Sequence, residues 1–214
     1  MLYGVNNPVI MDIGAYIGDV TQQYREIFTN SFIYSFEPFK DSYSKLHERF
    51  RTDKKIETIN SAISEESGFL DFNVNENFRT NSLLELDLAA DKNWPSCGLK
   101  HDKKEVVNSY SLDDFLKFKN IDNIDLLKID AQGYEFYILK GAYKSLVSSK
   151  IKIIYLEVIL KPTYKDQAKF DEILKYLYSL NYSLFDLYNK VYFNDGSLRQ
   201  MDVIFVENNF LQKL

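Results

Sequence analysis

Apolar stretches of strand length alternate with amphipathic stretches along the chain. The apolar runs predict strands at residues 9–13, 32–36, 56–63, 125–129 and 151–158. Between them, apolar residues recur with helical spacing at residues 21–28, 41–50, 135–146 and 166–180. Such alternation is typical of a parallel sheet with helices on its faces, so an α/β fold is expected.

The remaining segments predict further strands and one irregular region. Residues 69–74 alternate apolar with polar side chains, as in a half-exposed edge strand. Residues 75–104 show no regular period and are expected to be a substrate loop. Regularity returns at residues 106–110, and Ser111 is the predicted first residue of a short helix. Two closing strands are expected at residues 182–187 and 201–206, within one domain that spans residues 1–214.

Charge and cysteine content narrow the function classes. The 26 Lys and Arg against 31 Asp and Glu give a formal net charge of −5, so nucleic acid is not expected as a partner. Cys97 is the only cysteine, which excludes an internal disulfide and a multi-thiolate metal site. The sequence contains neither a leader pattern nor an unbroken apolar run long enough to span a membrane, so a cytoplasmic protein is expected.

A glycine turn follows the first predicted strand. Asp12 ends that strand, and Gly14 and Gly18 flank the turn before the next helix, where an open α/β sheet holds a nucleotide-like ligand. Tyr16 stands where a dinucleotide site needs a second glycine, and no Lys-Ser or Lys-Thr pair follows Gly18. The turn therefore admits a ligand closely but has no phosphate to grip, unless it serves only strand-to-helix packing.

Glu37 follows the second predicted strand directly. It lies 23 positions after Gly14, at the strand end where a carboxylate can accept both hydroxyls of an unphosphorylated ribose. The alternative is an exposed glutamate before Pro38. The two strand ends together favour a nucleoside ligand.

Four motifs then show a resemblance to a known family. They are Asp12-Ile-Gly-Ala-Tyr-Ile-Gly18, Phe36-Glu37-Pro38, Ser111-Leu-Asp-Asp-Phe115, and the run from Leu127-Lys-Ile-Asp-Ala-Gln-Gly-Tyr-Glu135 to Leu139-Lys-Gly-Ala142. Over almost its whole length the chain resembles the FkbM family of S-adenosyl-L-methionine-dependent methyltransferases. The common form of that family has Glu where Gln132 stands. The resemblance implies a class I methyltransferase fold, a Rossmann-like three-layer sandwich whose seven-stranded, mostly parallel sheet has an antiparallel last strand.

The resemblance also implies roles for individual residues. Better-known members methylate oxygen atoms of sugars or natural products, so O-methylation of a sugar, glycan precursor or natural product is expected, with S-adenosyl-L-methionine as cofactor. The residues expected around the cofactor are Asp12, Gly14, Ala15, Tyr16, Gly18, Glu37, Pro38, Ala62, Ile63 and Asp130.

Candidate catalytic residues are the acids near the later strand ends. Asp130 follows the strand at residues 125–129, and could remove a proton from the acceptor hydroxyl or cap the next helix. Glu135 and Glu157 are candidate acceptor contacts, and Glu157 is also a second candidate base. His101 could act as a base from the irregular segment, and Trp94 could stack on a sugar ring.

Several alternatives stay open at this stage. A non-catalytic protein that binds the same nucleoside would share the fold, and Gln132 in place of Glu is compatible with it. An NAD-dependent enzyme is disfavoured by Tyr16. The acid pair could bind a divalent ion, but no metal site is assigned. A homodimer is compatible with the sequence, and the acceptor itself has no motif.

Overall fold

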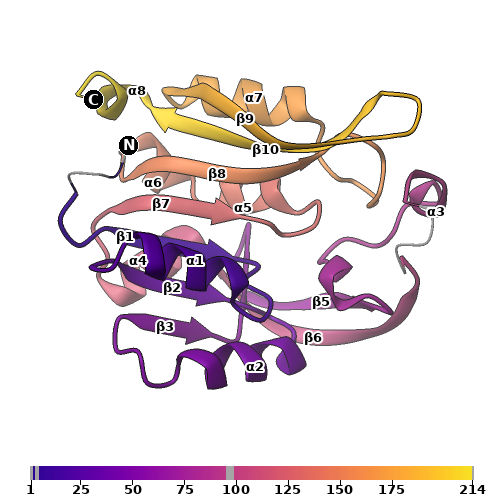
Figure 1. The fold of residues 1–214 in the computed structure, drawn as a ribbon, viewed down its shortest axis with the longest axis horizontal. Helices are drawn as coiled ribbons and strands as arrows, with labels where there is room; N and C mark the ends of the chain where they lie inside the picture. The colour runs from indigo at the N-terminus through magenta and orange to yellow at the C-terminus, as the bar shows by residue number, and fades with distance from the viewer. Residues whose placement is uncertain (1, 3–4, 95–98, 214) are drawn as a thin grey trace.

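A seven-stranded sheet forms the centre of the molecule (Figure 1). The computed structural model describes residue 2, residues 5–94 and residues 99–213, so Cys97 lies outside the described residues. In spatial order, the strands are β3 (Ile56–Ile59), β2 (Phe32–Phe36), β1 (Val9–Ile13), β7 (Ile124–Ile129), β8 (Ile151–Ile159), β10 (Leu198–Glu207) and β9 (Tyr182–Tyr192). The pairs from β3 through β8 are parallel, and β10 is antiparallel to both of its neighbours. The predicted seven-stranded sheet with a reversed last strand is confirmed.

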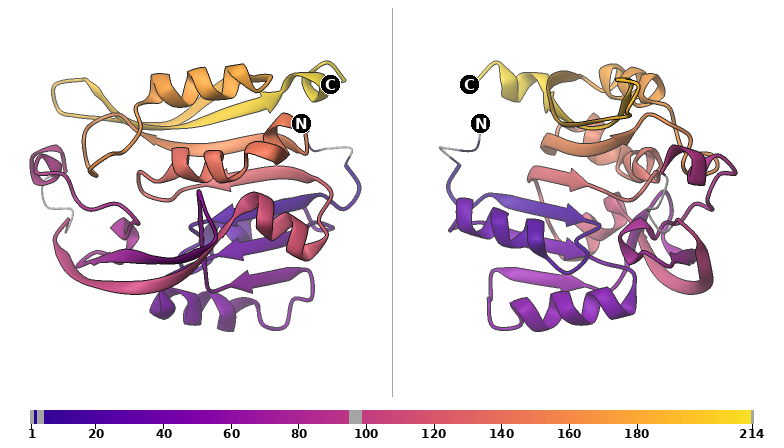
Figure 2. Two further views of the ribbon diagram at one scale, coloured as in Figure 1. Left: turned by 180° about the vertical axis from the view of Figure 1, so that it is seen from behind. Right: turned by 45° about the vertical axis from the view of Figure 1, so that its right-hand side comes forward.

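Helices cover both faces of this sheet (Figure 2). One face carries α1 (Asp19–Ile27) and α2 (Lys40–Phe50), with the short α8 (Asn208–Leu211) beside β10. The other carries α4 (Leu112–Lys119), α5 (Glu135–Gly141), α6 (Tyr143–Val147) and α7 (Phe170–Ser179). None of the helices in the described part of the chain combines the length and apolar character that a membrane span requires.

Alternate side chains along the strands supply the two halves of the core. Ile10, Ile33 and Leu126 pack on the side of α1 and α2, whereas Met11 and Leu127 pack with the helices of the opposite face. Strands that are buried on both faces need apolar residues on both, which is why they appear as continuous apolar runs in the sequence.

A second, three-stranded sheet was not predicted. It contains β4 (Ala62–Ser64), β6 (His101–Ser111) and β5 (Gly68–Asn75), with β6 in the centre. The prediction of one strand over residues 56–63 is therefore wrong, because the chain leaves the main sheet after Ile59 and β4 pairs with β6 instead. A single apolar run cannot show that its two halves pair with different neighbours.

Other boundaries also differ from the sequence prediction. The helix expected over residues 135–146 is interrupted at Ala142, and the helix expected from residue 166 begins at Phe170. Within the expected loop at residues 75–104 lie the 3-10 turn η1 (Phe78–Thr80) and the helix α3 (Ala90–Asn93). Its last residues, from His101, already belong to β6, so the segment is more regular than predicted. Ser111 does cap α4, accepting a hydrogen bond from the Asp114 amide at 3.1 Å.

Gly141 is the point where α5 meets the second sheet. A Cβ atom added there would lie 2.1 Å from the backbone oxygen of Ser64, at the end of β4. Only a residue without a side chain permits this approach of helix to strand, so Gly141 sets how closely the two sheets join.

We expect Gly141→Ala to lower the free energy of unfolding by about 1–3 kcal/mol, the usual cost of overpacking. In a solvent-exposed helix the same change would instead stabilise by up to about 1 kcal/mol. Urea denaturation measures the difference, and Lys144→Ala on the exposed side of α6 is the control, with a change below about 0.5 kcal/mol. An unchanged or higher stability in Gly141→Ala would show that Ser64 moves aside without cost.

Candidate functional site

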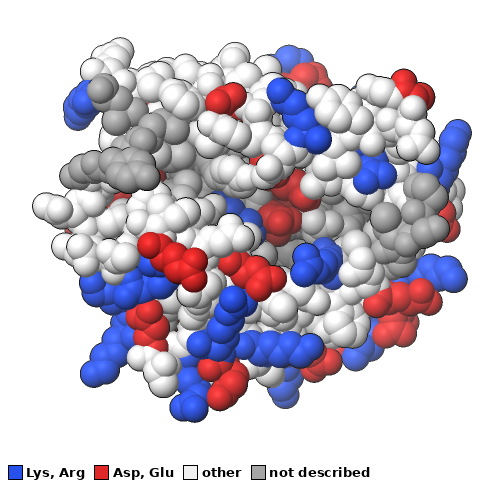
Figure 3. Space-filling model, viewed as in Figure 1, with Lys and Arg blue, Asp and Glu red and all other residues white. Residues whose placement is uncertain are grey.

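A cavity of about 360 Å³ lies at the carboxyl ends of β1, β2, β7 and β8. Its size falls within the range of small-molecule sites, and its place is where open α/β sheets bind ligands. The face shown in Figure 3 is hollowed near its centre, with acidic and basic side chains together in the hollow. Residues of η1 and the segment around Tyr164 line the side opposite the sheet.

The glycine turn after β1 forms one wall. Gly14 has a φ of +75°, and a Cβ there would lie 1.8 Å from the backbone oxygen of Asp130, so a side chain is excluded. Gly14, Ala15 and Tyr16 line the cavity. Gly18 does not: a Cβ at Gly18 would meet the ring of Phe50 at 2.4 Å, so this glycine permits packing of α2 against the turn.

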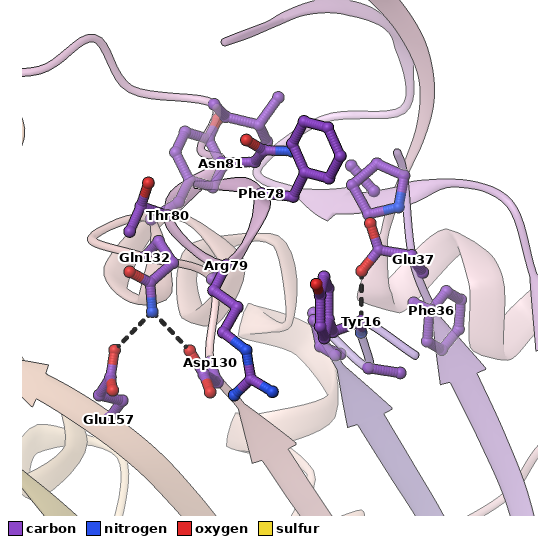
Figure 4. A pocket seen from close by; sticks show the side chains of 18 of the residues that line it. Tyr16, Phe36, Glu37, Phe78, Arg79, Thr80, Asn81, Asp130, Gln132 and Glu157 are labelled. Carbon is purple, nitrogen blue, oxygen red and sulfur yellow. Dashed lines mark hydrogen bonds between the residues drawn. The ribbon is translucent and has the colours of Figure 1, made fainter. Parts of the chain in front are cut away.

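Glu37 lines the cavity and also holds the turn in place. Its Oε2 accepts a hydrogen bond from the Tyr16 amide, and its Oε1 accepts one from the Phe39 amide, both at 2.9 Å. Burial raises the pKa of Glu37 to about 7, although these two hydrogen bonds act in the opposite direction. The carboxyl group thus joins the ends of β1 and β2 and faces the cavity (Figure 4).

Asp12 lies beneath this wall rather than in it. It is fully buried and does not line the cavity. Its Oδ1 is 2.9 Å from the ammonium of Lys128, and its Oδ2 accepts a hydrogen bond from the Thr21 hydroxyl at 2.6 Å. Lys128 also donates to the backbone oxygen of Gly14 at 3.0 Å, so the pair fixes the start of the turn from below.

The side-chain amide of Gln132 connects two carboxyl groups across the cavity floor. Its Nε2 donates to Oδ1 of Asp130 and to Oε2 of Glu157, each at 2.9 Å (Figure 4). Tyr164 completes the arrangement, because its hydroxyl lies 3.1 Å from the Gln132 amide oxygen. A glutamate at position 132 has no such N–H groups and would place a third carboxylate beside the other two.

Asp130 and Glu157 occupy different environments. Burial, followed by the nearby charges of Asp130 and Glu135, raises the pKa of Glu157 well above its usual value. Glu157 also accepts a hydrogen bond from the Gln200 side chain. The Asp130 side chain is 38% exposed and lies 3.8 Å from the Lys128 ammonium, so Asp130 is the more accessible of the two acids.

Glu135 binds backbone, not the cavity. Its Oε1 accepts hydrogen bonds from the amides of Ala131 and Gly133, at 2.9 and 3.1 Å. The residue is buried and is not among those lining the cavity. No described side chain caps α5, so the capping that the sequence offered as an alternative role for Asp130 is wrong, and Glu135 instead holds the turn that precedes the helix.

The remaining predicted site residues divide into two groups. Pro38, Ala62 and Ile63 line the cavity on the side of Glu37. Trp94 lines it too, but the guanidinium of Arg199 lies 3.9 Å from the centre of its ring. His101 is exposed at the start of β6 and does not line the cavity.

The residues that the structure brings into the site and that sequence reasoning missed include Arg79, Lys128 and Tyr164. Lys128 had a detectable signal, since it is a charged residue inside the buried run of β7. Arg79 and Tyr164 had none, because they come from irregular segments whose path back over the cavity is set by tertiary contacts. Across the described residues, no group of three or more His, Cys, Asp or Glu side chains is arranged to hold a metal ion.

Comparisons with known proteins show which proteins the chain is similar to. A family model described as the methyltransferase FkbM domain matches residues 12–184. The chain is 26% identical over 177 residues to the 2-O-methyltransferase NoeI of Sinorhizobium fredii. The aligned region covers 80% of this chain and 71% of NoeI.

Solved structures show the fold. An rRNA methylase from Streptococcus thermophilus superposes with a TM-score of 0.52 and 12% identity. The match covers 94% of this chain and 87% of the methylase chain. TrmK of M. capricolum, solved with S-adenosyl-homocysteine, has a TM-score of 0.53 and 15% identity over 96% of this chain, which spans 65% of the TrmK chain. The architecture is that of the class I methyltransferases.

Glu135 gives a pH-dependent prediction. Burial raises the pKa of Glu135 to about 7 from its ordinary value of 4.5, so the folded protein keeps a proton that the unfolded chain loses. Its contribution to the free energy of unfolding therefore falls as the pH rises from about 4.5 to 7. Glu135→Gln keeps an oxygen acceptor without the charge, so we expect its stability relative to the wild type to increase by about 1–3 kcal/mol between pH 4.5 and pH 8.

Urea denaturation at pH 4.5, 6 and 8 measures this difference. Glu26→Gln, at an exposed position of α1, is the matched control and should change stability by less than about 0.5 kcal/mol at each pH. A Glu135→Gln variant whose relative stability does not vary with pH would contradict the prediction.

Proposed function

This chain belongs to the FkbM methyltransferase family, and from that premise we propose that it transfers a methyl group from S-adenosyl-L-methionine to a hydroxyl of a sugar, glycan precursor or natural product. The observation that carries the proposal is the accessible carboxylate of Asp130, held at the end of β7 beside the glycine turn. The similarity to a 2-O-methyltransferase supports oxygen as the methylated atom.

The residues around the cavity fit the cofactor. The absence of a side chain at Gly14 lets the Asp130 backbone approach the turn that lines the cavity, and Glu37 presents a carboxyl group where ribose hydroxyls would bind. Phe36, Ala62 and Ile63 provide an apolar wall on the Glu37 side, suited to an adenine ring. When bound, S-adenosyl-L-methionine supplies the activated methyl group.

Asp130 is our candidate base. A hydroxyl is a weak nucleophile, and the Asp130 carboxylate can accept its proton as the oxygen becomes methylated. The Gln132 amide fixes the orientation of that carboxylate, and the Lys128 ammonium lies 3.8 Å from it. Glu157 is held by two side-chain amides, and its raised pKa favours the protonated form, which suits an acceptor contact better than a base.

A small acceptor agrees with the charge of the protein. The formal net charge of −5 provides no general attraction for a nucleic-acid backbone. A non-catalytic protein that binds the same cofactor is the alternative function. It predicts no formation of S-adenosylhomocysteine with any member of a panel of nucleotide sugars, glycans and hydroxylated natural products, whereas the proposed enzyme forms it with at least one.

The ribose contact is tested with Glu37→Gln. We expect calorimetry to show about ten- to hundred-fold weaker binding of S-adenosylhomocysteine, the usual value for hydrogen bonds to a charged group. Because the pKa of Glu37 is about 7, wild-type affinity should rise from pH 6 to pH 8 while that of the variant stays level. The analogue without the two ribose hydroxyls is the control, and should lose little affinity in the variant. An equal loss for both ligands would leave Glu37 as a support of the turn only.

The base is tested with Asp130→Asn. The variant keeps an oxygen to accept the Gln132 hydrogen bond, so we expect an unchanged fold and cofactor affinity within a few-fold of the wild type. Turnover should fall at least about a hundred-fold, the lower range for loss of a general base. Retained turnover would move the base role to Glu157, which also lines the cavity, and Glu157→Gln in the same assay would test that role.

A further inference from the structure

The cofactor of the proposed function carries a carboxylate at its methionyl end, and this anion needs a partner inside the cavity. Among the described residues that line the cavity, the cationic side chains are Lys128 and Arg79. Given the proposed function, the partner of this carboxylate is the group whose hydrogen-bond donors are not already used within the protein.

The backbone of the glycine turn offers few donors. The amides of Gly14 and Ala15 both donate to the backbone oxygen of Phe36, at 3.1 and 2.9 Å. The Tyr16 amide donates to Glu37, and the Gly18 amide donates to the backbone oxygen of Ala15 at 2.8 Å. Four amides that could otherwise surround an anion are therefore used within the protein.

Lys128 is also engaged. Its ammonium is buried, pairs with Asp12 at 2.9 Å and donates to the backbone oxygens of Ile13 and Gly14. Two of its three N–H groups are used in these hydrogen bonds, and its charge is paired with the buried Asp12 carboxylate. To bind a ligand carboxylate, Lys128 would have to leave Asp12 without its counter-charge in the interior, which is unfavourable.

Arg79 has no such commitments. It projects from η1 into the space between Tyr16 and Asp130 (Figure 4), with its guanidinium 5.1 Å from the centre of the Tyr16 ring. Its guanidinium lies 3.9 Å from the carboxylate of Asp19, and Arg49 already binds that carboxylate at 2.7 Å. The guanidinium therefore has donors available, and the cavity is where they can be used.

The short turn that carries Arg79 is anchored on both sides. The backbone oxygen of Thr80 accepts a hydrogen bond from the Tyr164 hydroxyl at 2.9 Å, and the Asn81 side chain accepts one from the Asn75 amide at 2.8 Å. The second sheet and the segment after β8 thus fix the backbone from which the Arg79 side chain, itself 67% exposed, reaches the cavity. An anchored backbone reduces the entropy lost when a ligand is bound.

We propose that Arg79 binds the methionyl carboxylate of the cofactor, and that η1 thereby covers the cofactor from the side opposite the sheet. Planar guanidinium groups bind carboxylates with two parallel hydrogen bonds, which a lysine cannot reproduce. The cofactor is then held by two separate parts of the chain, with the sheet edge contacting the nucleoside and η1 contacting the amino-acid end.

The experiment compares two ligands by calorimetry, without an acceptor. One is S-adenosylhomocysteine, and the other is its decarboxylated analogue, which keeps the amino group and lacks only the carboxylate. We expect Arg79→Ala to weaken binding of the first about ten- to hundred-fold and that of the second less than about two-fold. Arg79→Lys should recover part of the loss. Arg51→Ala, which removes an exposed cation that pairs with Glu48 outside the cavity, is the matched control and should leave both affinities within about two-fold.

Three results would overturn the proposal. An equal loss for both ligands would mean that Arg79 acts through its packing on Tyr16, and thermal unfolding of the variant would show whether the fold is affected. Unchanged binding of S-adenosylhomocysteine together with a raised KM for the acceptor would assign Arg79 to the acceptor instead. If the wild type binds neither ligand, the proposed function itself fails, which is a different outcome from a wild type that binds both while Arg79→Ala is silent.

Discussion

The ammonium of Lys128 balances the acidic side chains that gather at the carboxyl edge of the main sheet. Asp12 and Lys128 are register partners on β1 and β7, so their side chains emerge on the same face, where the amino end of α1 covers them. Breaking a buried ion pair by removing one partner typically costs about 3–5 kcal/mol, because the other charge is left uncompensated. The same ammonium contacts the backbone at Gly14 and lies near Asp130, so the shape of the turn and the position of the candidate base both depend on it.

Gln132 solves a second electrostatic problem without adding a charge. Asp130 follows β7, and Glu157 lies near the end of the neighbouring strand β8. Two carboxylates so placed repel each other unless a hydrogen-bond donor or a proton lies between them. The Gln132 side chain supplies one N–H to each. The common family form with Glu at this position would meet the same constraint differently, since a third carboxyl group needs a proton or a cation to be accommodated. A neutral amide here is therefore compatible with an ordered site rather than a sign of a lost one.

The second sheet explains how an irregular segment can be positioned accurately. Gly141 brings α5 against the end of β4, and β5 and β6 extend from there past the carboxyl ends of β1 and β2 (Figure 1). The chain between them returns over the strand ends, where Ser82 donates to the backbone oxygen of Gln132 at 2.8 Å. The segment that the sequence marks as a substrate loop is thus fastened to the cavity floor by specific hydrogen bonds.

The sequence by itself determined the main sheet and the side chains at its strand ends. Apolar runs buried on both faces fix β1, β2, β7 and β8, and Gly14 and Glu37 follow directly because local spacing places them at strand ends. Only the tertiary structure decided which charges neutralise each other. Asp12 pairs with Lys128, Gln132 bridges Asp130 and Glu157, and Arg79 reaches the cavity from η1. These contacts depend on residues that are far apart in the chain, and no local pattern carries that information. The roles of Asp130 and Glu135 show the same limit: both acids flank the start of α5, and only the three-dimensional arrangement turns one toward the backbone and the other toward the cavity.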